Sequence, residues 1–333
     1  MTNRRMITLA LAAALCTGCG RERPEGTLRV GYFPNITHSQ AIIGLARGDF
    51  ARETGPGIVI EPIVFNAGPS VIEALYAGEI DLAYIGPNPA VNGYIRSDGA
   101  ALRVVAGATS AGACLVVRSD EGISTPADLD GRTLASPQLG NTQDVALRCW
   151  LMDNGLSTLE QGGTVEVVAV QNPDIFDLFV QGQIDGAWVP EPWASRLVVE
   201  GGGTVLVDER DLWEGGRFPT ACVIASTRIL DENPELVEAW LRAHVSITRW
   251  ELANPDSAMA LVNSEIGRMT GKALPDSVMA MAWSRMTPTW DPLPECIVQS
   301  AEAAFRIGYL DEEPDLSGLC DLTILGRIAE AGR

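Results

Sequence analysis

The residues of this chain that could carry out chemistry or bind a ligand are hydrogen-bond donors that precede predicted helices. Residues 37–40 read T-H-S-Q between a predicted strand and a predicted helix, and residues 141–143, N-T-Q, hold the same position later in the chain. A helix N-terminus offers free backbone N–H groups and the positive end of the helix dipole, so extra donors there favour an anion. Capping alone would explain any single serine or threonine at such a position. Together, these residue types predict the binding of a small anion.

Motifs for covalent or metal-assisted catalysis do not occur in the sequence. It contains no G-x-S-x-G, H-E-x-x-H, Walker or G-x-G-x-x-G pattern. Of the two histidines, His244 falls within a predicted helix, where we expect a structural role, and His38 belongs to the first donor cluster. His38 could donate to a ligand or serve in capping and packing, and the sequence leaves both open. We expect neither an enzyme nor a cofactor.

The cysteine pattern gives no metal site. Five cysteines follow the N-terminal segment, namely Cys114, Cys149, Cys222, Cys296 and Cys320, and their spacing matches no zinc motif. An odd number leaves at least one thiol free unless two chains pair. We expect buried free thiols, with a bridge such as Cys296 to Cys320 as the alternative.

An internal repeat shows which elements position the donors. Residues 78–90 (G-E-I-D-L-A-Y-I-G-P-N-P-A) match residues 182–194 (G-Q-I-D-G-A-W-V-P-E-P-W-A) at an offset of 104. In each copy a helix ends at a glycine, a short apolar strand follows, and the chain enters a proline-bearing loop. Upstream, the two donor clusters align at an offset of 103. The repeat predicts two α/β lobes of the same plan.

These lobes predict a ligand cleft, because ligands of open parallel sheets gather beyond the carboxyl ends of the strands. We assign residues 27–110 and 218–333 to lobe 1 and residues 111–217 to lobe 2, with crossings near 108–112 and 218–222. Two edges of similar construction would then face one another, and the chain would close around its ligand.

Four large side chains of the repeat need separate interpretation. Tyr84 and Trp188 alternate within strands, which favours the core, whereas Trp193 follows a proline in a loop and suits an apolar wall of the cleft. Glu191 could accept a hydrogen bond from a ligand amine or cap a helix. The sequence leaves both roles of Glu191 open.

The charge balance excludes several partners. The chain has 24 Lys and Arg against 43 Asp and Glu, a net charge of -19, and Lys272 is its only lysine. Such a surface is unsuited to nucleic acid or to an anionic membrane, and it keeps a soluble protein dispersed. It would also repel a small anion at long range, so an anion site must be built from local dipoles and donors.

The N-terminus reads as a targeting segment. Arg4 and Arg5 precede a short apolar run over 6–15 and the sequence C-T-G-C, which ends at Cys19. Residues 1–18 resemble a bacterial lipoprotein signal, with Cys19 as the lipidated residue and 19–26 as a tether. Cys16 stands where that signal usually has leucine, and simple secretion or a retained anchor are the alternatives. The remaining chain is expected on the extracytoplasmic (periplasmic) side of the membrane.

Four blocks of the sequence resemble one family of binding proteins. They are N-I-T-H-S-Q-A (35–41), A-G-E-I-D-L-A-Y-I-G-P-N-P-A (77–90), P-Q-L-G-N-T-Q-D (137–144) and W-V-P-E-P-W-A-S-R (188–196). In these blocks the chain is similar to solute-binding lipoproteins of ATP-binding-cassette importers for nitrate, sulfonate and taurine, above all to aliphatic-sulfonate binders. The resemblance runs from about residue 28 to residue 310. It implies a two-lobed periplasmic-binding-protein fold of the two-crossover type.

The resemblance also implies a site, partners and a function. The ligand would lie among fourteen residues: Asn35, Thr37, His38, Ser70, Gly86, Asn88, Thr109, Ser110, Asn141, Thr142, Gln143, Trp188, Glu191 and Trp193. A monomer would capture a small organic anion and deliver it to permease and ATPase subunits. The nitrate branch carries a lysine at its site, and the turn around Lys272 is a doubtful place for one. Nitrate, taurine or a pyrimidine-type solute, an enzyme in the same fold, and a sensory domain are the alternatives.

Overall fold

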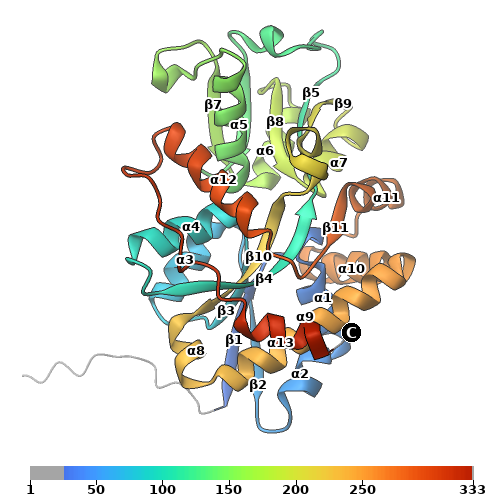
Figure 1. The fold of residues 1–333 in the computed structure, drawn as a ribbon. Coiled ribbons are helices and arrows are strands. Elements are labelled where there is room, and N and C mark those ends of the chain that lie inside the picture. The colour runs from blue at the N-terminus through green and yellow to red at the C-terminus, as the bar shows by residue number, and fades with distance from the viewer. Residues whose placement is uncertain (1–25, 332–333) are drawn as a thin grey trace, which may run out of the picture.

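The computed structural model describes residues 26–331, which form two mixed sheets flanked by helices. The first sheet has the order β11-β4-β10-β3-β1-β2 and forms the core of lobe 1 (Figure 1). The second has the order β7-β6-β8-β5-β9 and forms the core of lobe 2. The strands are β1 Thr27–Tyr32, β2 Val59–Val64, β3 Leu82–Ile85, β4 Leu102–Ala111, β5 Ala113–Arg118, β6 Thr133–Pro137, β7 Glu166–Val170, β8 Gly186–Pro190, β9 Gly203–Asp208, β10 Pro219–Ser226 and β11 Met286–Pro288.

Helices cover both faces of each sheet, as parallel strands with continuous apolar runs require. The helices are α1 Ser39–Arg47, α2 Asp49–Thr54, α3 Gly68–Tyr76, α4 Pro87–Arg96, α5 Thr142–Asp153, α6 Asn172–Val180, α7 Trp193–Val199, α8 Thr227–Glu232, α9 Pro234–Ala253, α10 Pro255–Thr270, α11 Asp276–Arg285, α12 Pro294–Arg306 and α13 Thr323–Ala331. Short 3-10 turns include η1 Ile36–His38 and η4 Glu209–Leu212. On one side of the first sheet Phe50 of α2 stacks on Trp240 of α9, with 3.5 Å between ring centroids.

The two lobes share their hydrogen bonding as well as their sequence. Asp81 Oδ2 accepts from the backbone N–H of Arg29 at 2.9 Å, and Asp185 Oδ2 accepts from that of Thr133 at 2.8 Å. Asp81 thereby joins the start of β3 to β1, and Asp185 joins the start of β8 to β6. The internal repeat is therefore a repeat of structure, and the predicted two-lobed α/β fold is confirmed.

Two long strands carry the chain between the lobes. β4 extends to Ala111, and its last residues pair with β10 and β11. The bend lies at Ala111 and Gly112, with φ of 62° and 86°. Glycine suits this place because such positive φ values disfavour other residues. β10 makes the return and lies antiparallel between β3 and β4.

The C-terminal helices reach back across both lobes. α12 lies against α5, and α11 packs on α7 (Figure 1). α11 starts at Asp276 and α12 at Pro294. β11 and α13 were not predicted, since three residues make no periodic pattern and α13 follows a long irregular segment.

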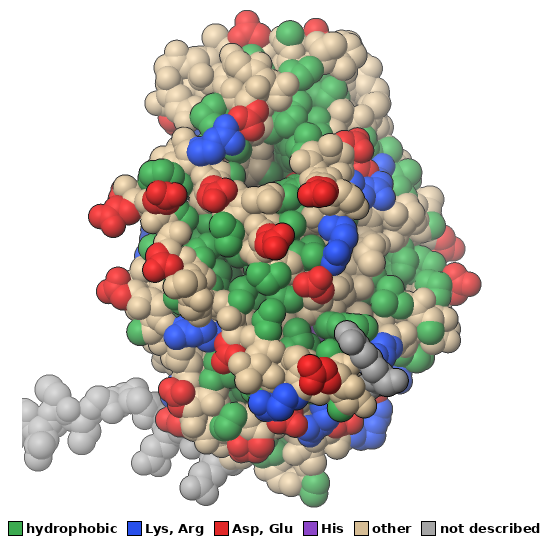
Figure 2. All heavy atoms as spheres, viewed as in Figure 1, with side chains coloured by type: hydrophobic (Ala, Val, Ile, Leu, Met, Phe, Trp, Pro, Cys, Tyr) green, Lys and Arg blue, Asp and Glu red, His purple; other side chains and the backbone are tan. Residues whose placement is uncertain are grey.

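The surface and the thiols give little sign of further sites. Figure 2 shows acidic, basic and apolar side chains interspersed over one face. All five cysteines of residues 26–331 are free thiols, so the Cys296 to Cys320 bridge is absent there. Within this range no helix has the length and apolar character to cross a membrane, and no cluster of metal-ligand side chains occurs. The targeting segment and Cys19 lie outside the described residues.

Candidate functional site

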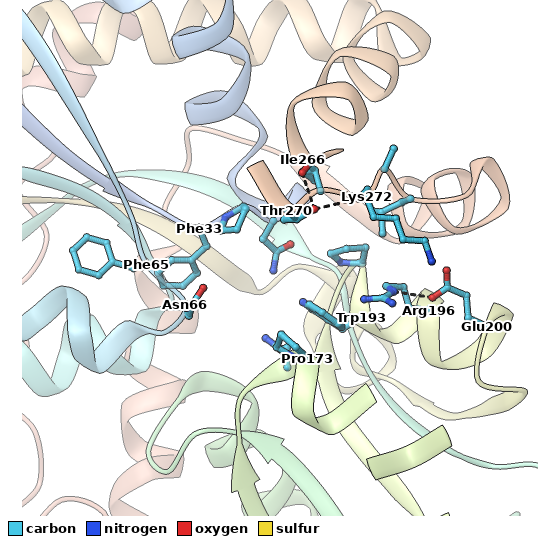
Figure 3. Close-up of a pocket in the computed structure, with 16 residues that line it drawn as sticks. Phe33, Phe65, Asn66, Pro173, Trp193, Arg196, Glu200, Ile266, Thr270 and Lys272 are labelled. Atoms are coloured by element: carbon cyan, nitrogen blue, oxygen red, sulfur yellow. Dashed lines mark hydrogen bonds and ion pairs between the residues drawn. The ribbon is translucent and has the colours of Figure 1, made fainter. Parts of the chain in front are cut away.

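A cavity of about 340 Å³ lies between the two lobes. Its walls from lobe 1 and the helices that follow it include Phe33, Asn35, Phe65, Asn66, Ile266 and Lys272. Its walls from lobe 2 include Asn172, Pro173, Pro192, Trp193, Arg196 and Glu200. Phe33 and Phe65 lie on one side of it, and Arg196, Glu200 and Lys272 on the other (Figure 3). Of the predicted ligand residues, Asn35 and Trp193 line this cavity.

The two lobes touch where the second donor cluster meets lobe 1. A Cβ atom placed on Gly86 would lie 2.6 Å from Thr142 Oγ1 and 3.7 Å from Asn141 Oδ1. Gly86 precedes α4 and Thr142 opens α5, so two helix N-termini from opposite lobes converge here. The sequence predicted that the 141–143 cluster faces the 37–40 cluster of lobe 1; the structure brings it to Gly86, and the meeting of the two clusters stays a prediction.

Two of these donors have no protein partner. Thr142 Oγ1 and Gln143 Nε2 are buried and make no hydrogen bond within residues 26–331. A buried polar group without a partner costs about 1–3 kcal/mol, so such groups call for an explanation. Two unpaired donors at one helix start, one of them against Gly86 of the opposite lobe, are suited to a ligand with acceptor oxygens.

Asp144 shapes the loop that presents these donors. Its carboxylate accepts from Ser136 Oγ at 2.6 Å, Gly140 N at 2.9 Å and Arg148 Nε at 3.0 Å. Tyr309, which follows α12, donates its hydroxyl to the same carboxylate at 2.7 Å. These bonds fix the loop that precedes α5, and the bond from Tyr309 ties this loop to the C-terminal helices.

His38 is neutral and lies behind the wall of the cavity. Burial lowers its pKa to about 3. Its Nδ1 accepts from the backbone N–H of Phe33 at 3.1 Å, and the two rings stack at 4.6 Å. Because Nδ1 accepts and the ring is neutral, the proton lies on Nε2. The packing role that the sequence offered for His38 is thereby confirmed, and donation from Nε2 to a ligand stays a prediction.

His244 has the structural role expected of it. Burial lowers its pKa to about 4, and its Nε2 lies 2.8 Å from the carbonyl oxygen of Gly107. A carbonyl can only accept, so Nε2 donates and Nδ1 accepts from the hydroxyl of Tyr84 at 2.9 Å. Tyr84 and Trp188 are fully buried, as predicted for core residues.

Glu191 accepts from protein groups. Its carboxylate accepts from the backbone N–H and the hydroxyl of Ser195, both at 2.9 Å, and from Arg285 Nη1 at 3.0 Å. Burial raises its pKa, and these bonds counteract part of that rise. The bonds to Ser195 resemble those of a helix cap, while Arg285 links the loop to α11.

The other predicted residues lie outside the cavity walls. Ser70 is exposed within α3, whose N-cap is Ala67. Asn88 exchanges hydrogen bonds with Ser300 of α12, at 3.2 and 2.7 Å. Thr109 and Ser110 lie on β4, where Thr109 Oγ1 donates to Thr37 O at 2.7 Å and Ser110 faces a second cavity at the hinge. Trp188 Nε1 donates to Glu209 at 2.7 Å.

Sequence reasoning missed the cationic wall of the cavity. Lys272 follows α10 in a loop, and Arg196 lies on α7 three residues after Trp193. The sequence contained a feature that could have pointed to each residue. Lys272 is the only lysine of the chain, and Arg196 belongs to the block W-V-P-E-P-W-A-S-R. The structure corrects the doubt about Lys272, because the return of the chain brings its loop to the cleft.

Comparison with known proteins identifies relatives of one kind. The model of the NMT1-like family matches residues 21–264. A taurine-binding periplasmic protein of Escherichia coli K12 is 29% identical over 219 residues, which span 65% of this chain and 64% of the relative. The matched region thus spans less than two thirds of that relative's length.

Solved structures share the fold. An alkanesulfonate-binding protein from Xanthomonas axonopodis pv. citri, bound to MOPS, superposes with a TM-score of 0.74 at 21% identity, covering 89% of this chain and 98% of the other. A periplasmic nitrate-binding protein from Synechocystis PCC 6803 superposes with a TM-score of 0.72 at 17% identity, covering 92% and 89%.

Proposed function

Because the chain belongs to the NMT1-like family, we propose that it is the extracytoplasmic solute-binding component of an ATP-binding-cassette importer and that its solute is an aliphatic sulfonate. The observation that carries this proposal is the pair of buried, unpartnered donors at the start of α5, Thr142 Oγ1 and Gln143 Nε2, of which Thr142 Oγ1 lies against Gly86 of the other lobe. A sulfonate has three acceptor oxygens and one charge, and neutral donors at helix N-termini suit it.

The proposed mechanism is hinge closure without bond chemistry. Residues 27–110 with 218–333 would move against residues 111–217 about the strands β4 and β10. The ligand's oxygens would bridge Thr142 and Gln143 to the first donor cluster, and its organic part would lie among Phe33, Trp193 and their neighbours. Closure would thus be coupled to binding, and the closed form would be the one that the permease accepts.

Further parts of the proposal concern partners and location. We propose that the protein is a monomer, that it delivers its solute to permease and ATPase subunits, and that Cys19 carries a lipid anchor. The net charge of -19 supports a dispersed surface. The signal-like sequence before Cys19 supports the anchor.

Nitrate is the second candidate, and the position of Lys272 favours it. This lysine lines the cavity between the lobes, and a lysine could hold a small inorganic anion. Nitrate would leave most of the 340 Å³ cavity to water, however, whereas an alkyl chain would fill its apolar walls.

Isothermal titration tests the proposal. Taurine, methanesulfonate, longer alkanesulfonates, nitrate and bicarbonate would be titrated into the mature protein at fixed ionic strength. We expect a sulfonate to bind most tightly. Binding of nitrate or bicarbonate with no binding of any sulfonate would contradict the proposal.

A further inference from the structure

The far wall of the cavity carries an excess of positive charge. Arg196 and Lys272 line it against one carboxylate, that of Glu200, in a chain whose net charge is -19. Figure 3 shows all three on the side away from Phe33 and Phe65. This local charge of opposite sign is placed where the organic part of a ligand would end.

Arg196 is held in place and retains free donors. Its guanidinium carbon lies 4.2 Å from the ring centroid of Phe176 and 4.7 Å from that of Trp193, and its Nε donates to Glu200 at 2.9 Å. Within the described range its Nη groups have no hydrogen-bond partner. A guanidinium held against two aromatic rings is prepared to receive an acceptor with little loss of side-chain entropy.

The loop that carries Lys272 is also fixed. Asn263 donates to the carbonyl of Leu274 at 2.9 Å and accepts from its N–H at 2.8 Å, and Thr270 Oγ1 donates to the carbonyl of Lys272 at 3.1 Å. Within residues 26–331 the ammonium group of Lys272 forms no salt bridge. The backbone is therefore positioned while the charge remains available.

We propose that this wall is a second subsite, formed by Arg196 and Lys272, that binds an anionic group at the other end of the ligand. The solute class is then an organic sulfonate that also carries a terminal carboxylate or second sulfonate. This inference rests on the proposed function, because it takes the first donor site to hold the sulfonate.

The same wall acts against taurine. The ammonium group of taurine would approach Lys272, a like charge, and Arg196 already lies over the ring of Trp193 as a cation. Glu200 is the single carboxylate on the wall, and Arg196 uses it. The subsite therefore determines specificity by attraction to one ligand end and repulsion of another.

The test compares three ligands that differ at one end. Butane-1-sulfonate, 4-sulfobutanoate and 3-aminopropane-1-sulfonate would be titrated calorimetrically into the mature protein and its Lys272→Met and Lys272→Arg variants. We expect 4-sulfobutanoate to bind at least about tenfold tighter than the amine, since opposite and like charges add their effects. Lys272→Met should reduce the ratio of the two affinities about fivefold or more, and Lys272→Arg should retain this ratio.

The failures of the two proposals differ in this experiment. If butane-1-sulfonate binds and the ratio is about one or is the same in Lys272→Met, the subsite is refuted and the proposed function stands. If Lys272→Met abolishes butane-1-sulfonate binding too, Lys272 holds the sulfonate itself and the second subsite is refuted. If none of the three ligands binds to a folded wild-type protein, the proposed function fails.

Discussion

Replacing Gly86 by alanine should obstruct closure of the two lobes. The new methyl carbon would lie 2.6 Å from Thr142 Oγ1, and ordinary contact begins at 3.4 Å, so the lobes must part by 0.8 Å at this point. Rotation of the Thr142 side chain about χ1 gives limited relief. In two of its three staggered rotamers either Oγ1 or Cγ2 points toward Gly86. The overlap is therefore between lobes rather than within one.

The expected cost follows from overpacking. Extra methyl groups in packed surroundings cost about 1–3 kcal/mol, so we expect the dissociation constant for the best sulfonate to rise about tenfold to hundredfold. The open form should be unaffected, since Gly86 has φ of -69° and ψ of 154°, which alanine adopts freely. The melting temperature without ligand should change little.

A double-mutant cycle makes the test specific. In a Thr142→Ala background the hydroxyl is gone, and the Thr142 Cβ at 3.6 Å leaves room for the new methyl group. Gly86→Ala should then cost almost nothing further. Gly326→Ala on α13, where a Cβ would meet no atom within 4 Å, is the matched control.

Titration calorimetry and thermal unfolding of these variants decide the matter. Wild-type affinity in Gly86→Ala, or an equal loss in both backgrounds, would refute the view that ligand binding requires Gly86 and Thr142 to meet.

Four further predictions concern separate features. Thr142→Ala should weaken sulfonate binding about tenfold with a small change in melting temperature, whereas a mere capping role would lower stability by about 1 kcal/mol and leave affinity unchanged. Tyr309→Phe removes the 2.7 Å bond to Asp144 and should lower stability by about 1.5–3 kcal/mol in thermal unfolding, and an unaltered transition would show that this bond contributes nothing. Burial raises the pKa of Glu251 to about 8 from an ordinary 4.5, so between these pH values the folded state holds a proton that the unfolded state loses, and stability should fall as pH rises from about 4.5 to 8. In denaturant titrations Glu251→Gln should remove this pH dependence, and parallel stability-against-pH curves for the wild type and the variant would disprove the role of Glu251. Cys19→Ser should release the protein from membranes or block its processing, and a wild-type protein that takes up no fatty-acid label in metabolic labelling would exclude the anchor.

The sequence by itself determined the fold class, the duplicated plan and the donor clusters. Local signals suffice for these, because the repeat of glycine, aspartate and aromatic residues at residues 78–90 and 182–194 imposes the same helix end, strand and loop in both lobes. The equivalent bonds of Asp81 and Asp185 show how one residue type at one offset reproduces one structure. The meeting of the 141–143 cluster with lobe 1 was likewise predictable, since carboxyl ends of parallel strands gather ligands.

Only the tertiary structure decided which of the polar residues have partners and what closes the cleft. The resemblance placed Asn88 and Glu191 among the ligand residues, but α12 and α11 supply Ser300 and Arg285 to them from more than ninety residues away. Lys272 reaches the cavity because α10 returns to the cleft, a placement set by packing and by the Asn263 bonds rather than by local pattern. Contacts between residues that are far apart in the chain depend on how the backbone folds back on itself. The hydrophobic periodicity of each element carries no information about that course.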